Sequence, residues 1–236
     1  MRKRRATLIF IGGAVVLALL AGAMPNMIAE SPSLQISFPW QTSTHPSTDQ
    51  PAQPGTALEA LSTLEVKGRA PKTGYTRDQF GSGWATVRGC STRDIIMYRD
   101  LINVTLSDEC KVASGLLNDT YTGNPIQYTV ANASVIQIDH VVALSDAWQT
   151  GAQLLTSKQR QQLANDPLEL IAVSGKANQQ KSDANAASWL PSNKAFRCEY
   201  IARQIAVKKK YTLWVIPAEQ QAMKDILATC PTQALP

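Results

Sequence analysis

The feature that most constrains this chain is an apolar run that ends in an acid and a histidine, with an amide and a lysine much later. The run 135–138 leads into Asp139 and His140, and Asn178 stands 38 residues after His140. The run predicts a strand with the acid and the imidazole at its end. Asn178 and Lys181 are three residues apart in a predicted helix and so share a face. The fold must therefore bring one strand end to one helix face.

The N-terminus has the pattern of an export signal. Four consecutive basic residues, Arg2 to Arg5, precede an uncharged, mostly apolar stretch at 7–23, and Ala21-Gly22-Ala23 offers a cleavage site. We expect residues 1–23 to engage the export machinery. A span of 17 residues also approaches the roughly 17 to 25 that cross a bilayer, so an uncleaved membrane anchor is the alternative. In both cases the rest of the chain is exported, either secreted or held at the cell surface.

Residues 24–56 predict a linker. From 25 to 56 the chain has no Lys or Arg and is rich in Pro, Ser, Thr and Gln. Such a segment buries too little apolar surface to offset its ordering entropy, so we expect a disordered tether. His45 lies in it, which leaves His140 as the one imidazole of the folded part. We expect a single folded domain at 57–236, a monomer of ordinary size.

The charge balance is a weak guide to the partner. The whole chain carries a net charge of +5; without the four basic residues of the N-terminus and the acids Glu30 and Asp49, 19 basic and 16 acidic residues remain, a balance of +3. A mildly basic domain is compatible with a polyanionic partner but does not identify one.

The cysteines point to disulfides rather than to a metal site. All four fall in the predicted domain: Cys90, Cys110, Cys198 and Cys230. An even number in an exported protein predicts two disulfides, with three connectivities open. We favour the local pairing, Cys90 with Cys110 and Cys198 with Cys230, in which each closed loop would stabilise the fold by about 3 kcal/mol. The chain has no CxxC motif, and His140 is far from every cysteine in sequence, which disfavours zinc.

Local patterns predict a mixed α+β domain without internal repeats. Helices are expected at 57–64, at 93–103 after a Thr92 cap, at 143–150, at 156–164, after a Ser174 cap, at 193–207 and at 217–229. Strands are expected at 110–117, 135–138 and 168–173, with a turn at 118–125 and a loop or edge strand at 66–75. We expect 208–210 to be a solvated lysine turn between the last two helices.

Strand, strand and helix in this order form a ββα unit that can hold one divalent ion against a phosphate. Asp139 supplies a hard oxygen ligand and Asn178 an amide oxygen, which suit Mg²⁺ or Mn²⁺. His140, with an ordinary pKa of about 6.5, can take a proton from an attacking water. Lys181 can neutralise charge that develops on the phosphate. These residue types predict metal-assisted hydrolysis of a phosphodiester.

Several sequence blocks are more specific than the order of predicted strands and helix. IDHVVAL followed by PLELIAVSGKANQQKSDAN resembles the HNH (ββα-metal) nuclease superfamily. The blocks GRAPKTGYTRDQFGSGW, GCSTRD, YTG, IDHVVALSDAWQTGA, LANDPLEL and WLP are similar to an exported actinobacterial branch of HNH endonuclease proteins, from about Leu61 to Cys230.

The resemblance implies a ββα-metal (HNH) nuclease core embedded in a helical, disulfide-stapled domain. It implies cleavage of DNA, with RNA as the alternative, and one divalent cation, Mg²⁺ first and Mn²⁺ second. In this family pattern His140 is the general base, Asp139 and Asn178 are metal ligands, and Lys181 lies near the phosphate. Since no base-reading module is recognisable, we expect weak sequence preference.

One position departs from the family pattern. The middle asparagine of the family, which orients the catalytic histidine through its strand backbone, usually stands in an Asn-Leu pair, and here that pair is Glu169-Leu170. A glutamate can accept a hydrogen bond and still hold the loop. Asn165, in the preceding turn, is the other candidate for this role.

Two rival functions remain at this point. An exported module that keeps the scaffold only to bind nucleic acid or a cell-envelope polymer is one, and Glu169 is the residue that favours it. A hydrolase of another polymer, with Asp139 and Glu169 as paired carboxylates, is the other. The second leaves His140 and Asn178 without roles, so we rank it last.

Other residues have a structural and a functional interpretation. Arg93 and Asp94 either flank the site and position phosphate or form a cap and ion pair, and we favour the structural role. Tyr121, Trp148 and Trp189 either stack on bases or belong to the core, and we favour the core.

Overall fold

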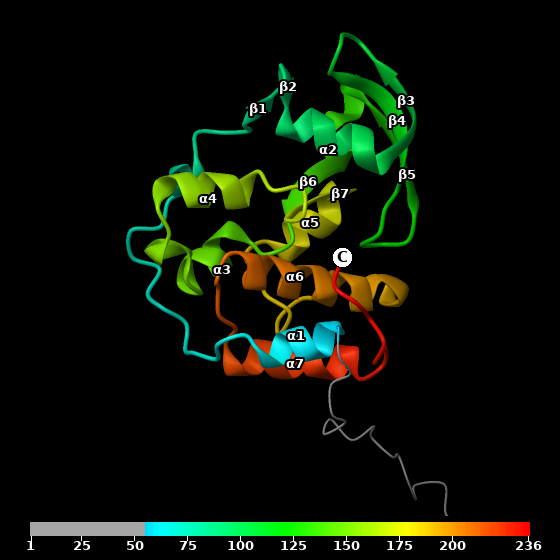
Figure 1. The fold of residues 1–236 in the computed structure, drawn as a ribbon. Coiled ribbons are helices and arrows are strands. Elements are labelled where there is room, and N and C mark those ends of the chain that lie inside the picture. The colour runs from blue at the N-terminus through cyan, green and yellow to red at the C-terminus, as the bar shows by residue number, and fades with distance from the viewer. Residues whose placement is uncertain (1–54) are drawn as a thin grey trace, which may run out of the picture. The chain divides into compact units, whose positions relative to one another are not determined.

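The structure, a computed structural model, describes residues 55–236, which fall in one compact unit of mixed helices and strands (Figure 1). The predicted export segment 1–23 and almost all of the predicted linker 24–56 lie outside the described residues. Among residues 55–236 no helix has both the length and the apolar character needed to cross a bilayer.

The helices occupy much of the described chain. The α-helices are α1 (Ala57–Ser62), α2 (Thr92–Asp100), α3 (Leu144–Gln149), α4 (Ser157–Ala164), α5 (Gly175–Lys181), α6 (Arg197–Lys210) and α7 (Pro217–Leu227). The 3₁₀ helices are η1 (Arg77–Phe80), η2 (Val130–Val135), η3 (Ala152–Leu154) and η4 (Lys194–Phe196).

The strands form small antiparallel sheets. They are β1 (Thr86–Val87), β2 (Cys90–Ser91), β3 (Leu101–Leu106), β4 (Val112–Asn118), β5 (Pro125–Thr129), β6 (Ile136–His140) and β7 (Leu170–Ser174). β1 pairs with β2, β3 with β4 and β4 with β5, and β6 pairs with β7 so that His140 faces Leu170. The predicted order of strand, strand and helix is therefore present in β6, β7 and α5.

The β6–β7 pair separates two hydrophobic cores. Ile136, Ile138, Leu170 and Ala172 pack with α2 and the three-stranded sheet. The alternate residues Ile171 and Val173 pack into the larger core built around α1, α6 and α7, helices that lie together in Figure 1. Burial of both faces explains why this second strand reads as a continuous apolar run rather than an alternating one.

The predicted helix at 93–103 was wrong at both ends. Its N-cap is Ser91, whose hydroxyl accepts a hydrogen bond from the Asp94 N–H, and the helix ends at Asp100. Residues from Leu101 onward form β3, which pairs with β4 and buries Leu101 in the smaller core. The β-branched residues of this segment favour a strand, and a partner strand from elsewhere in the chain made that preference decisive.

The last two helices also differ from the prediction. Residues Lys194–Phe196 form η4, and α6 continues through the three lysines 208–210. Lys208 has no exposed side-chain surface and forms ion pairs with Asp146 and Glu219. The prediction of a solvated lysine turn was thus wrong for Lys208, because α3 and α7 bring two carboxylates to this side of α6.

The predicted disulfide pairing is confirmed. Cys90 is bonded to Cys110 and Cys198 to Cys230. The first bond ties β2 to the loop between β3 and β4, and the second ties the first turn of α6 to the segment after α7. Tyr121 and Trp148 are buried in the larger core, as the core interpretation predicted.

Candidate active site

His140 ends β6 and is held by a backbone carbonyl. Its Nε2 lies 3.0 Å from the Ala164 oxygen at the end of α4. Because a carbonyl only accepts hydrogen bonds, Nε2 carries the proton, and Nδ1 is left with the lone pair. Burial lowers the pKa of His140 to about 3, and the positive charge of Arg77 adds to this effect. The imidazole is therefore neutral at pH 7, in the form that accepts a proton.

Trp84 covers the ring of His140. The two rings are parallel, 5.8 Å apart between centroids with 4° between their planes. Among residues 55–236 the Asn165 side chain forms its hydrogen bonds away from β6: its Oδ1 accepts one from the Ala85 N–H at 2.8 Å, and its Nδ2 donates one to the Gln161 oxygen at 3.0 Å. Asn165 thus holds the backbone beside Trp84, and the carbonyl of the preceding Ala164 holds His140. The predicted role of Asn165, orienting the histidine through its strand, does not match these contacts.

Glu169 holds the chain just after His140. Its Oε2 accepts a hydrogen bond from the Val142 N–H at 3.2 Å, and its backbone oxygen accepts one from Val141 at 2.9 Å. A glutamate that accepts a hydrogen bond from the loop was one of the two possibilities for this position, and these are the contacts that Glu169 makes. The side chain is fully buried, and burial raises its pKa well above the ordinary value. Glu169 does not line the cavity described below, which removes support for paired carboxylates around a glycan.

Asp139 is buried and takes hydrogen bonds on both oxygens. Lys181 Nζ lies 3.0 Å from Oδ1, and the Tyr121 hydroxyl donates to Oδ2. Burial raises the pKa of Asp139, while the Lys181 charge and the Tyr121 hydrogen bond oppose that rise. The carboxylate therefore has a fixed orientation at the cavity wall.

Lys181 lies behind Asp139 rather than in front of it. Its side chain has 0% exposure, and Nζ also donates to the His140 backbone oxygen at 2.8 Å. It is absent from the cavity wall. Contact with a phosphate, which the sequence predicted for Lys181, is not what this geometry provides; the lysine anchors the Asp139-His140 segment instead.

Asn178 is placed by the first turns of α5. Ser174 caps this helix by accepting a hydrogen bond from the Ala177 N–H, as the sequence predicted. The Asn178 Nδ2 donates to Gln137 Oε1 at 2.9 Å. Since the amide nitrogen is engaged, the Oδ1 atom is the end of the side chain that can serve as a ligand.

The loop between β4 and β5 ties the strand to the helix. Tyr121 of this loop contacts Asp139 on β6, and Asp119 Oδ1 accepts a hydrogen bond from the Ser174 N–H at 2.9 Å. Both loop residues are buried. One loop that the sequence showed only as a turn thus holds one candidate ligand and the N-cap of the helix that carries the other.

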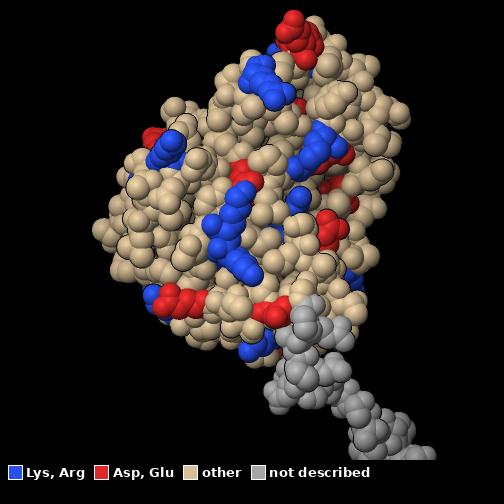
Figure 2. All heavy atoms as spheres, viewed as in Figure 1, with Lys and Arg blue, Asp and Glu red and all other residues tan. Residues whose placement is uncertain are grey.

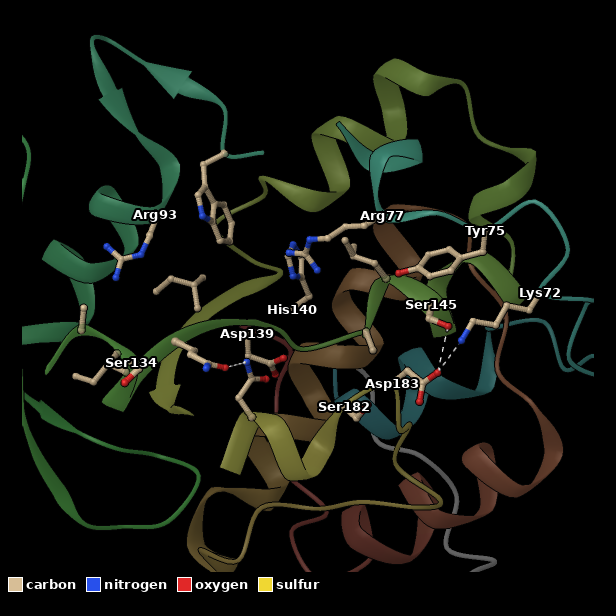
Figure 3. A pocket seen from close by; sticks show the side chains of 18 residues that line it. Lys72, Tyr75, Arg77, Arg93, Ser134, Asp139, His140, Ser145, Ser182 and Asp183 are labelled. Atoms are coloured by element: carbon tan, nitrogen blue, oxygen red, sulfur yellow. Dashed lines mark hydrogen bonds and ion pairs between the residues drawn. The ribbon is translucent and has the colours of Figure 1, made fainter. Parts of the chain in front are cut away.

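A cavity of about 780 Å³ brings these groups together. Its wall includes all of β6, because the edge of β6 that does not pair with β7 faces the cavity. Asp139, His140 and Asn178 all line it, and so do three cations, Lys72, Arg77 and Arg93 (Figure 3).

Arg77 is the cation nearest to His140 in Figure 3. Among residues 55–236 no carboxylate lies within ion-pair distance of it. Arg77, rather than Lys181, is thus the unpaired positive charge beside the imidazole. On the face seen in Figure 2 basic and acidic side chains are interspersed, in keeping with the low net charge.

The donors on the cavity wall suit a hard divalent cation. Asp139 offers a carboxylate and Asn178 an amide oxygen. Within the described part of the chain there is no group of three or more His, Cys, Asp or Glu side chains arranged as a metal cage. Mg²⁺ usually takes only one or two carboxylates and fills its other positions with water and phosphate oxygens. The residues present therefore fit such an ion by donor type.

Comparison with known proteins gives the family. Residues 92–226 match the family described as GmrSD restriction endonucleases, C-terminal domain, which is more than half of the 236 residues. The chain belongs to this family. Membership in this GmrSD C-terminal family supports a nuclease-related domain, and the matched segment contains β6, β7 and α5.

A curated relative is similar over most of its length. An "Uncharacterized secreted protein" of Arthroderma benhamiae (strain ATCC MYA-4681 / CBS 112371) is 41% identical over 178 residues, which is 74% of this chain and 85% of the relative. The relative is fungal, so this comparison does not show the actinobacterial branch that the sequence blocks resembled. No solved structure matches.

Several residues of the candidate site were missed by the sequence reasoning. Arg77 and Trp84 lie in the block GYTRDQFGSGW, which carried the resemblance, so a signal was present without a role. Tyr121 was expected in the core, but its hydrogen bond to Asp139 was not predicted. Gln137 gave no signal beyond its alternation with apolar residues in β6.

Proposed function

We propose that this protein is an exported endonuclease that hydrolyses phosphodiester bonds of DNA with the help of one divalent cation. One observation carries the proposal. The Ala164 carbonyl fixes the tautomer of His140, so that Nδ1 holds the lone pair in a cavity that also presents Asp139, Asn178 and the unpaired Arg77.

The residues divide the work as follows. His140 Nδ1 accepts a proton from a water molecule, the oxygen of that water forms a bond to phosphorus, and the bond from phosphorus to the leaving sugar oxygen breaks. The Arg77 guanidinium neutralises charge on the phosphate oxygens, which it can contact through two parallel hydrogen bonds. Trp84 and Ala164 keep the imidazole in one orientation, and Glu169 holds the backbone that follows it.

Asp139 and Asn178 would hold the cation. When bound, the cation supplies Lewis-acid stabilisation of the phosphate and of the leaving oxygen. Lys181 and Tyr121 fix the carboxylate of Asp139 from behind. Substitution of residues that hold a metal ligand in this way commonly changes the metal affinity about 10- to 100-fold.

The substrate and location follow from other features. A nuclease-related family implies a nucleic acid as substrate, and DNA is our first choice with RNA as the alternative. The low net charge supports weak sequence preference. Export is supported by the name of the fungal relative and by the two disulfides, which persist in oxidising compartments.

The test is plasmid degradation by the full-length protein with Mg²⁺ or Mn²⁺, with EDTA, and with His140→Ala. We expect cleavage that EDTA abolishes and that His140→Ala reduces by at least about 100-fold, the usual size of general-base catalysis. Lys224→Ala, on α7, is the matched control. Cleavage that survives in His140→Ala would contradict the mechanism.

A second candidate is a non-catalytic module that binds nucleic acid. The observation in its favour is that Lys181 and Tyr121 already engage both oxygens of Asp139. It predicts salt-sensitive DNA binding without turnover under any divalent cation.

A further inference from the structure

The cavity extends away from His140 toward a second arginine. Arg93 stands in the first turn of α2 and lines the same cavity as His140 and Arg77. Figure 3 places Arg93 at one end of the cavity and Lys72 at the other, with His140 and Arg77 between them. The three cations come from separate parts of the fold: the loop before η1, η1 itself and α2.

The charge at the two ends is unequal. Lys72 lies 3.1 Å from Asp183, whose carboxylate also accepts a hydrogen bond from the Ser145 hydroxyl at 3.3 Å. The positive charge of Lys72 is thus matched by an acid on the same wall.

At the other end, the one acid of residues 55–236 within ion-pair distance of Arg93 is Asp94, with a long contact of 3.6 Å between Nη1 and Oδ1. The other oxygen of Asp94, Oδ2, accepts a hydrogen bond from the Ser91 hydroxyl at 2.6 Å. An ion pair of this length between partly exposed groups contributes little. Arg93 therefore keeps most of its donors free while its side chain, 30% exposed, faces the cavity.

We propose that Arg93 binds a second phosphate of the same nucleic-acid strand, next to the one that Arg77 contacts at the site of cleavage. This inference rests on the proposed function and assigns the direction in which the strand leaves the site, toward α2. A guanidinium matches the two oxygens of a phosphate in a way that a lysine does not, which suits an arginine at both positions.

Binding in the absence of cleavage is the first test. The full-length protein would be titrated with a labelled single-stranded DNA oligonucleotide in EDTA at several salt concentrations, and affinity followed by fluorescence anisotropy. Loss of one phosphate contact reduces the slope of log K against log salt by about 0.7 for single strands. We expect this change for Arg93→Gln and no change for Lys224→Gln, which removes a partly buried charge on α7. Equal slopes for the two variants would overturn the proposal.

Substrate length is the second test. With Mg²⁺ or Mn²⁺, kcat/KM would be compared for single-stranded DNA and for bis(p-nitrophenyl) phosphate, a diester with one phosphate. A charged hydrogen bond worth roughly 1.5 to 3 kcal/mol corresponds to at least about a tenfold loss. Arg93→Gln should lower the preference for DNA over the small diester by this factor, whereas Arg77→Gln should impair both substrates.

The two ideas fail separately. A wild-type protein that cleaves neither substrate with either metal contradicts the proposed nuclease, while the salt slopes still decide the role of Arg93. Cleavage of both substrates with an unchanged preference in Arg93→Gln contradicts the second phosphate site and leaves the nuclease standing.

Discussion

Two fully buried lysines do similar chemistry in different places. Lys181 contacts Asp139 and the His140 carbonyl at the cavity wall. Lys208 contacts Asp146, Glu219 and the Trp214 carbonyl among the helices. Lys208 faces two acids, whereas Lys181 faces one acid that also lines a cavity. The same kind of buried ion pair can therefore link helices, as at Lys208, or support a candidate ligand, as at Lys181, depending on whether its carboxylate reaches a cavity.

The largest effect on stability is expected at Lys208. Lys208→Met keeps the volume of the side chain but leaves Asp146 and Glu219 buried without their shared cation. Removing one partner of a buried ion pair costs about 3–5 kcal/mol, so we expect a loss of this size in unfolding free energy measured by urea titration. Lys209→Met, at the exposed neighbouring position, is the control. Equal stability of the two variants would show that the ion pairs of Lys208 do not stabilise the fold.

Lys181→Met should lower the free energy of unfolding slightly less than Lys208→Met does, and a bound cation should restore part of the loss. Tyr121 still donates to Asp139 in this variant, and a divalent cation can replace the lost charge. Binding at 100 times Kd adds about 2.7 kcal/mol of stability. We expect Mn²⁺ to raise the melting temperature of Lys181→Met more than that of the wild type, with no such excess for Lys208→Met. Lys176→Met, exposed on α5, is the control; an equal Mn²⁺ effect in all variants would contradict a cation at Asp139.

Two tyrosines of one aromatic cluster offer a finer comparison. Tyr121 and Tyr200 are both fully buried, with ring centroids 5.6 Å apart. The Tyr121 hydroxyl donates to Asp139, while the Tyr200 hydroxyl accepts from Gln204. Tyr121→Phe should change Mn²⁺ affinity, measured by calorimetry, by about tenfold or more. Tyr121→Phe and Tyr200→Phe should each lose about 1 kcal/mol of unfolding free energy. Tyr200→Phe should leave the Mn²⁺ affinity unchanged.

The smallest effect concerns Glu169 and depends on pH. Burial raises its folded pKa above the unfolded value. Its contribution is therefore fully present below the unfolded pKa and is lost as pH rises through the folded pKa. Glu169→Gln keeps an acceptor for the Val142 N–H but does not ionise. We expect the stability of Glu169→Gln relative to wild type to increase from pH 5 to pH 9; a difference independent of pH would contradict a buried acid.

The fold was predictable where the signals were local. The order of β6, β7 and α5 followed from two apolar runs and the Ser174 cap. The helix at 93–103 was misjudged because Leu101 and its neighbours fit a helical stripe and a strand equally well, and only pairing with β4 decided between them.

The candidate site was predictable in part for the same reason. Asp139, His140 and Asn178 were expected together and line one cavity. Lys181 shares a helix face with Asn178, but spacing within a helix does not say which residue of that face meets a cavity and which meets the interior. Arg77 and Trp84 come from a segment far upstream, and no local pattern relates that segment to β6.

The sequence by itself determined the order of β6, β7 and α5, the candidates Asp139, His140 and Asn178, and the disulfide pairing that we favoured, because periodicity, caps and cysteine spacing act over short stretches. The tertiary structure decided which charges are free. Lys181 and Lys208 are buried in ion pairs with carboxylates that come from other elements. Arg77 has no carboxylate within ion-pair distance among residues 55–236. That outcome depends on which distant segments pack together, and it settled which cation stands beside His140.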